Sequence, residues 1–103
     1  MSVIYILYDR GQRIAKPEHI VRIEAISNYS KIYFTNGYPM TVAKVLQWFQ
    51  QQLPEEMFAR VHRSHLVNKL FVTRIISQKQ SSVQMSNGET INISRRKKAT
   101  IIV

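Results

Sequence analysis

The chain has 103 residues, enough for one domain that buries roughly 65% of the surface of its unfolded state. It contains no Cys, which excludes disulfides and thiolate metal sites, and its longest apolar run, residues 3–8, is far shorter than the ~20 residues of a membrane-spanning helix. Fifteen Lys and Arg against six acidic residues give a net charge of +9, which would attract duplex DNA, RNA or an anionic membrane leaflet; the alternative is a solvated basic surface. We expect a cytoplasmic protein without membrane insertion.

The first part of the chain has the pattern of strands separated by turns. Residues 3–8 are rich in Ile, Tyr and Val, which favour strands, and Asp9-Arg10-Gly11 supplies a turn. A helical turn is expected at 17–19, followed by a second strand that begins at Ile20. Loop-favouring residues at 27–30 interrupt this strand.

An Asn-Gly pair at 36–37 predicts a first β-hairpin, because this dipeptide is the strongest short hairpin signal. The strand before it alternates between apolar and other residues with period two. We expect Ile32 and Phe34 to lie opposite Val42 and Met40, which centres the turn on Gly37 and requires a three-residue bulged loop.

A second Asn-Gly pair, at 87–88, predicts a second hairpin of the same kind. Here Val83 and Met85 would lie opposite Ile93 and Ile91, which centres the turn on Gly88. A two-residue loop would place the apolar residues of the two strands on opposite faces, so a three-residue loop is again expected.

The segment between the hairpins holds the one convincing helix, at about 43–53. Its apolar side chains are spaced as a single helical stripe, formed by Val42, Leu46, Phe49 and Leu53. Pro54 ends the helix, and residues 71–76 are expected to form another strand. The chain 1–103 is therefore predicted to be one mostly β domain: packed antiparallel β-sheets in an elongated, sandwich-like arrangement, with one main helix and short helical turns.

The segment 60–68, Arg-Val-His-Arg-Ser-His-Leu-Val-Asn, places Arg63 and Ser64 at the exposed middle of a loop. An exposed Arg without acidic neighbours in sequence suits a guanine edge or a phosphate. His62 fits a DNA contact and a hydrogen-bonded, partly buried position equally well. Asn68 is expected to cap the short turn that follows it.

A second basic segment, 94–98, follows the second hairpin. Ser94 could cap a short terminal helix with Arg95 and Arg96 in its first turn, where their charges oppose the helix dipole. An anion bound at that end would resolve this conflict. The alternatives are a solvated basic tail or a strand at 100–103.

A third candidate loop is Asn28-Tyr29-Ser30-Lys31. Asn can form a paired hydrogen bond with adenine, and Ser and Lys suit phosphates. The alternative is an ordinary turn in which Tyr29 packs against the sheet.

Three stretches of the chain resemble the LytTR DNA-binding domain, the effector module of many bacterial response regulators. The first is Ile23–Ile32, the second and most specific is Leu53–Asn68, and the third is Asn87-Gly88 followed by Ile93–Arg96. The resemblance covers about residues 18–98, with the order and spacing of the motifs intact.

The resemblance implies a β-rich fold whose loops, in place of a recognition helix, enter the grooves of double-stranded DNA. It also implies a transcription regulator that binds promoter repeats, often as two copies on neighbouring sites. With the loops described above, it leads us to expect DNA contacts from Asn28, Tyr29, Ser30, Lys31, His62, Arg63, Ser64, Arg95, Arg96 and Lys97. His65 takes a place more often filled by an aromatic residue. No cofactor or metal is implied.

Domains of this family usually follow a phosphoacceptor receiver domain, and nothing in these 103 residues could form one. We therefore expect a stand-alone LytTR-type regulator. It would be controlled by its abundance or by a separate regulatory protein.

Other function classes fit the same residues less well. An enzyme is not expected, since no carboxylate lies near His62 and Ser64 to orient the His, and two His without Cys or Asp make a poor metal site. The remaining alternatives are an RNA or single-strand nucleic-acid-binding module and a basic protein-interaction module. The basic C-terminal region offers only Phe71 for base stacking, which favours duplex DNA.

Overall fold

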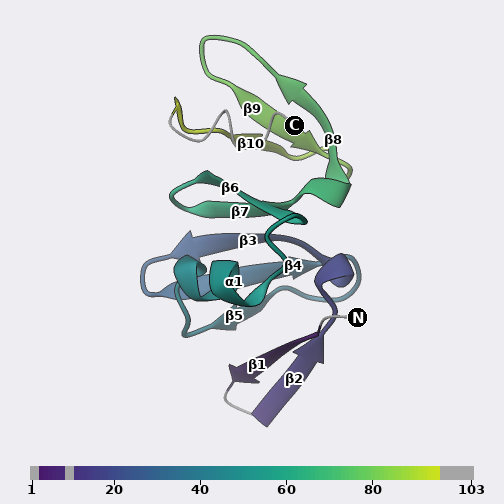
Figure 1. Cartoon of the computed structure of the whole chain (residues 1–103), viewed down its shortest axis with the longest axis vertical. Coiled ribbons are helices and arrows are strands. Elements are labelled where there is room, and N and C mark those ends of the chain that lie inside the picture. The colour runs from purple at the N-terminus through teal and green to yellow at the C-terminus, as the bar shows by residue number, and fades with distance from the viewer. Residues whose placement is uncertain (1–2, 9–10, 96–103) are drawn as a thin grey trace.

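The computed structural model describes residues 3–8 and 11–95. These residues form three antiparallel sheets, one α-helix and two short 3-10 helices in an elongated body of 43 × 27 × 22 Å (Figure 1). The predicted architecture, mostly β with one main helix, is confirmed. None of the helices in the described part of the chain is long and apolar enough to cross a membrane.

The first sheet is a hairpin of two strands, β1 (Ile4–Tyr8) and β2 (Gly11–Ala15). The sequence predicted β1 but not β2, because residues 12–15 show no apolar alternation. β2 forms because β1 supplies a partner at every position, from Ile4 opposite Ala15 to Tyr8 opposite Gly11. The predicted helical turn follows as the 3-10 helix η1 (Pro17–His19) and is confirmed.

The central sheet has five strands in the order β5-β4-β3-β7-β6. Their bounds are β3 (Ile20–Ile26), β4 (Tyr29–Phe34), β5 (Met40–Val42), β6 (Phe58–His62) and β7 (His65–Asn68). The helix η2 (Lys69–Phe71) leads out of this sheet. The side chain of Asn68 accepts a hydrogen bond of 2.9 Å from the N–H of Leu70, so Asn68 caps η2 as predicted.

The third sheet has three strands in the order β10-β9-β8. Its strands are β8 (Val72–Ile76), β9 (Ser82–Met85) and β10 (Thr90–Asn92). Figure 1 shows this sheet beyond β6, at the end of the molecule opposite the β1–β2 hairpin.

The helix α1 (Leu46–Gln52) covers one face of the central sheet (Figure 1). The four residues of the predicted apolar stripe are all buried in one core, with Phe49 fully inaccessible. The helix is shorter than the predicted 43–53, because the chain remains extended through Val45 and Val42 belongs to β5. A second core lies between the other face of the sheet and the three-stranded sheet; it includes Val61, Val67 and Met85.

The register predicted for the first hairpin is wrong by two residues. Ile32 lies opposite Met40, and Ser30 lies opposite Val42. A five-residue connection, 35–39, replaces the predicted three-residue loop. A shift of two leaves every side chain on its predicted face, so the apolar pattern could not distinguish the two registers.

The register of the second hairpin also differs by two residues. Val83 lies opposite Ile91, where Ile93 was predicted. The N–H of Met85 donates to the carbonyl of Glu89 at 2.7 Å, which leaves a three-residue loop, 86–88. The loop length is as predicted, but its centre is Asn87. Gly88 has a φ of +93°, which favours glycine.

Candidate nucleic-acid interface

Two turns of the central sheet lie side by side at one end of its strands. Ser27-Asn28 joins β3 to β4, and Arg63-Ser64 joins β6 to β7. β3 and β7 are antiparallel neighbours, with Glu24 opposite His65. The N–H of Ala25 also donates to the carbonyl of Ser64 at 2.9 Å, so the backbone itself holds the two turns together.

The chain after β10 reaches the same side of the molecule. The N–H of Ser94 donates to the carbonyl of Val61 at 2.8 Å, which places Arg95 beside the last residues of β6. We call these three segments, 27–28, 63–64 and 94–95, the turn edge. They lie along the left side of Figure 1, one above the other on the long axis of the molecule.

The spacing along the turn edge follows from the order of the strands. The turn at 27–28 lies between β4 and β3, and the turn at 63–64 lies two strands further, between β7 and β6. Two strand spacings of ~4.8 Å place them about 10 Å apart. This separation is comparable with the ~12 Å width of the major groove of B-DNA.

The second turn presents one exposed cation. Arg63 is exposed, whereas His62 and Ser64 are half-buried. The backbone N–H of Ser64 donates to Nδ1 of His62 at 3.2 Å, and the Ser64 hydroxyl lies 2.9 Å from the same nitrogen. Nδ1 of His62 therefore acts as an acceptor within the turn, which leaves Nε2 as the ring nitrogen that can donate.

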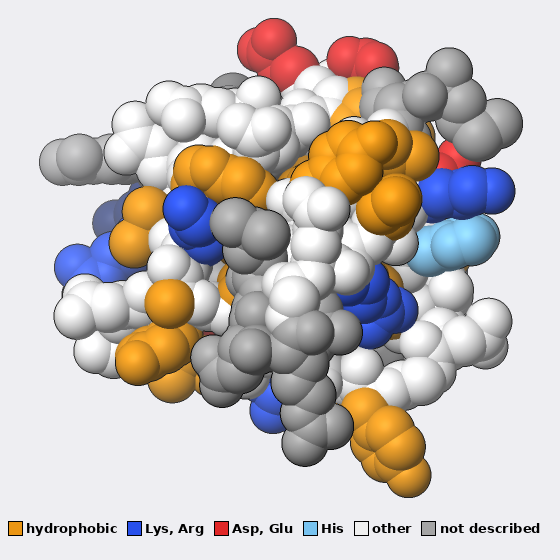
Figure 2. Space-filling view, turned by 90° about the horizontal axis from the view of Figure 1, so that it is seen from below, with side chains coloured by type: hydrophobic (Ala, Val, Ile, Leu, Met, Phe, Trp, Pro, Cys, Tyr) orange, Lys and Arg blue, Asp and Glu red, His pale blue; other side chains and the backbone are white. Residues whose placement is uncertain are grey.

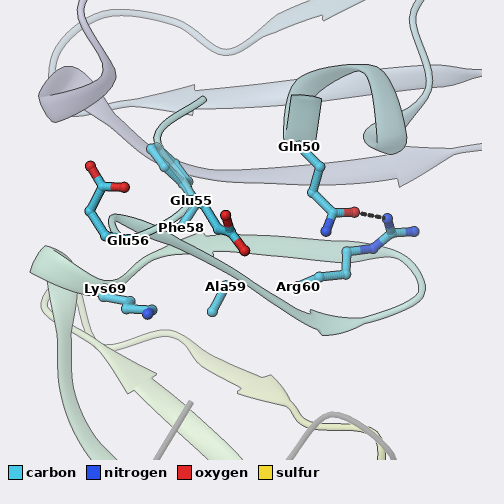
Figure 3. Close-up of a pocket in the computed structure, with 7 residues that line it drawn as sticks. All are labelled: Gln50, Glu55, Glu56, Phe58, Ala59, Arg60 and Lys69. Carbon is cyan, nitrogen blue, oxygen red and sulfur yellow. Dashed lines mark hydrogen bonds between the residues drawn. The ribbon is translucent and has the colours of Figure 1, made fainter. Parts of the chain in front are cut away.

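Arg60 supports this turn from β6. Its Nε donates to the carbonyl of His62 at 3.0 Å, its Nη2 donates to the carbonyl of Arg63, and its Nη1 donates to Oε1 of Gln50 on α1 at 2.7 Å (Figure 3). Arg60 is not among the DNA-contacting residues expected from the sequence. Its position at the start of the segment 60–68 was the only signal in the sequence, and its partners depend on the fold.

The first turn exposes Asn28 and Tyr29, and Ser27 takes a φ of +56° that suits a two-residue hairpin. Lys31 is half-buried, with its Nζ 5.3 Å from the centre of the Tyr33 ring.

Ser30 does not belong to the exposed loop in which the sequence analysis placed it. It is fully buried in β4, and its hydroxyl donates to the carbonyl of Lys44 at 2.5 Å. A side chain without accessible surface cannot contact DNA in this conformation, so Ser30 supports the strand. Its spacing of two from Ile32 was the signal for an inward orientation.

The third segment is described only at its start. Arg95 is exposed. Arg96 and Lys97, and the helix or strand expected after them, lie outside the described residues.

His65 lies behind the turn edge on β7. Its ring is 5.5 Å from that of His62, measured between centroids. Burial lowers the pKa of His65, the charge of Arg22 acts in the same direction, and the charge of Glu24 opposes them. In the described structure Nδ1 of His65 is buried without a hydrogen-bond partner. These features favour the neutral ring.

One hollow on the described surface is a different site. It has a volume of about 490 Å³, and its lining includes Glu55, Glu56, Arg60 and Lys69 (Figure 3). The two carboxylates offset the charges of Arg60 and Lys69, so this hollow attracts a phosphate less than a purely cationic one would. No three His, Asp or Glu side chains come together as a metal site in the described part of the chain.

Positive charge is not confined to the turn edge. Figure 2 views the molecule from the end that carries the β1–β2 hairpin, and it shows Lys and Arg side chains on both flanks. Acidic side chains gather mainly at the upper rim of this view. Positive charge alone therefore does not distinguish the turn edge from the rest of the surface. Its distinguishing feature is that three segments come together there.

The fold and the turn edge define a small β-rich domain with a face suited to anions. Comparison with known families identifies it further: the family of the LytTr DNA-binding domain matches residues 11–102, nearly the whole chain. The chain belongs to this family and is a DNA-binding regulatory domain. The resemblance stated from the sequence is confirmed.

A solved structure shares the fold. It is a LytTr DNA-binding domain of a protein from Bacillus cereus described as a methyl-accepting/DNA response regulator, with a TM-score of 0.80 and 24% sequence identity. The match covers 97% of this chain and 93% of the other. The search of curated proteins found no match.

Proposed function

We propose that this domain regulates transcription by binding specific sequences in duplex DNA, at promoter repeats, through the turn edge. The observation that carries the proposal is the position of three segments, far apart in sequence, along one long side of the molecule. Backbone hydrogen bonds between Ala25 and Ser64 and between Ser94 and Val61 link these segments to one another. A preformed surface of this kind avoids the entropic cost of ordering loops on binding.

Each segment supplies chemistry suited to DNA. Arg63 and Arg95 are exposed, and a guanidinium group can form two hydrogen bonds with O6 and N7 of guanine or bind a phosphate. Asn28 can form a paired hydrogen bond with adenine, and Lys31 can neutralise a phosphate. The remaining proposed contacts are Tyr29, His62, Ser64, Arg96 and Lys97.

The same surface would bind one repeat for each copy of the chain, so two copies would occupy neighbouring repeats. A separate regulatory protein or the abundance of the chain would control binding. We place this activity in the bacterial cytoplasm, where the chromosome lies. No catalytic step is part of the proposal.

The experiment that tests the proposal is selection of bound duplexes from a random pool, followed by affinity measurements on the selected site and on a scrambled duplex. Arg63→Ala should weaken binding to the selected site by ~1–3 kcal/mol and should relax the preference at one base position. Lys16→Ala, which removes an exposed charge near the opposite end of β3, is the matched control. Failure to enrich any sequence would contradict the proposal.

Two further measurements separate the competing functions. With about five phosphates contacted, affinity should fall roughly 10²–10³-fold between about 50 and 200 mM salt. A weak salt dependence would favour a basic protein-interaction module. Tighter binding to single-stranded DNA or RNA than to the duplex would favour the single-strand function.

A further inference from the structure

A hollow of about 250 Å³ lies beside the third segment of the turn edge. It is formed by the loop between β8 and β9 and by the chain that leaves β10. Its lining residues are Gln78, Lys79, Gln80, Ser81, Ile93, Ser94 and Arg95. Two of these side chains are cationic, four are polar and none is acidic, so the hollow has the chemistry of an anion site.

The two walls of the hollow are held together by hydrogen bonds on both sides of one residue. The N–H of Ile93 donates to the carbonyl of Ser81 at 2.9 Å, and the carbonyl of Ile93 accepts from Nε2 of Gln80 at 3.1 Å. The buried side chain of Ile93 anchors this arrangement in the second core. The β8–β9 loop therefore has a defined position beside Arg95 before any ligand binds.

Lys79 is the cation that this arrangement adds to the interface. It is exposed, as are Gln78 and Arg95 on either side of the hollow. No ion pair involving Lys79 or Arg95 occurs in the described part of the chain, where the ion pairs are those of Arg22. Two neighbouring cations without anionic partners repel each other, and a bound anion removes that cost.

We propose that this hollow binds a phosphate of the DNA backbone, with Lys79 and Arg95 as its cationic ligands, so that the β8–β9 loop is a fourth DNA-contacting segment. This inference rests on the proposed function of the turn edge. Lys is a compact charge that neutralises a phosphate without distinguishing bases, whereas Arg63 is placed to contact a base. Lys79 therefore adds affinity and fixes the position of the duplex, and it does not select a sequence.

The experiment compares Lys79→Gln with the wild-type domain on the selected site and on a scrambled duplex, over a range of salt concentrations. Loss of one phosphate contact should reduce the slope of log affinity against log salt by about 0.9. The same slope predicts an affinity loss of about fivefold at ~150 mM salt and of about 15-fold at ~50 mM. The loss should be equal on both duplexes. Gln matches both neighbours of Lys79, so the variant is expected to fold.

Two matched variants serve as controls. Lys16→Gln removes the same charge before the start of β3. The seven residues of β3 span about 23 Å and separate Lys16 from the turn at 27–28, so the slope should be unchanged. Lys79→Arg keeps the charge and should restore the slope. Phosphate-ethylation interference should identify one phosphate whose modification weakens the wild-type domain but no longer affects Lys79→Gln.

The outcomes separate this site from the function on which it rests. If Lys79→Gln and Lys16→Gln have the same slope while Arg63→Ala loses the selected site, the phosphate site is wrong and the proposed function stands. If the wild-type domain shows no salt-dependent duplex binding, both proposals fail. A loss confined to the selected duplex would overturn the assignment of Lys79 to a phosphate.

Discussion

The guanidinium group of Arg22 and the carboxylate of Glu89 form two hydrogen bonds between the central sheet and the three-stranded sheet. Nε lies 3.0 Å from Oε1, and Nη2 lies 2.8 Å from Oε2. Arg22 is buried and its group lies over the Tyr33 ring, 3.9 Å from the centroid. Burial opposes the charge of Arg22, but the hydrogen bond and charge of Glu89 outweigh this effect, so the pKa of Arg22 is raised.

This ion pair helps to set the position of the third segment of the turn edge relative to the other two. Arg22 lies on β3, which carries the first turn, and Glu89 lies in the hairpin that leads to Ser94 and Arg95. The pair is therefore coupled to the geometry of the interface as well as to the packing of the two sheets.

Glu89→Ala should destabilise the domain, because it leaves a buried guanidinium group without its main acceptor. A hydrogen bond to a charged group contributes about 1.5–3 kcal/mol to the free energy of unfolding. Because Glu89 is partly exposed, we expect a loss near the lower limit of this range. Denaturant titration measures this loss. Glu55→Ala removes an exposed carboxylate and is the control; equal stabilities of the two variants would contradict the prediction.

Arg60→Ala should weaken specific binding through the position of the second turn. The variant loses the hydrogen bonds that hold the carbonyls of His62 and Arg63, and we expect the affinity for the selected duplex to fall by about 1–2 kcal/mol. The salt slope should stay at the wild-type value, because Arg60 is not assigned to a phosphate. A reduced slope with unchanged specificity would instead mark Arg60 as a phosphate contact. Gln51→Ala, on the exposed side of α1, is the control.

Ser30→Ala and Asn28→Ala should have opposite effects. Ser30→Ala removes a buried hydrogen bond to the carbonyl of Lys44 and should lower the free energy of unfolding by about 1 kcal/mol, with DNA affinity unchanged where the domain is folded. Asn28→Ala should leave stability within about 0.5 kcal/mol and should weaken binding to the selected site. Thermal unfolding and duplex titration of both variants measure these effects. Weaker DNA binding by Ser30→Ala than by Asn28→Ala would contradict the prediction.

The stability of the domain should fall as the pH decreases from about 7.5 to 5.5. Burial lowers the pKa of His65, so the unfolded chain takes up a proton in this range more readily than the folded domain. The contribution of His65 to the free energy of unfolding is fully present above its ordinary pKa of 6.5. It is lost as the pH falls through that value toward the lower pKa of the folded state. His65→Phe should flatten this part of the profile, measured as melting temperature against pH.

Glu89 acts in a separate and more acidic range. The hydrogen bond from Arg22 lowers the pKa of Glu89, so its contribution to stability is present above its ordinary pKa of 4.5 and is lost as the pH falls through the lower folded value. A steep loss of stability in His65→Phe between about pH 7.5 and 5.5 would contradict the assignment of that range to His65.

The contrast between Ser30 and Arg63 shows how far local pattern extends. The residues next to Arg63 in the sequence are enough to predict an exposed turn, and Arg63 is exposed in the turn between β6 and β7. Ser30 was assigned to a loop from its type, although its spacing from Ile32 indicated the buried face of the strand. A polar residue type favours exposure on average, but the period of a strand decides the direction of an individual side chain.

The sequence by itself determined the mostly β class, the buried stripe of α1, the cap at Asn68 and the existence of both hairpins. Each of these depends on interactions among residues close together in the chain. The tertiary structure decided the two registers, the partner of Arg22, the support of the second turn by Arg60 and the position of Lys79 beside Arg95. These depend on contacts between distant segments, and an alternating apolar pattern repeats every two residues, so it is satisfied equally by registers that differ by two.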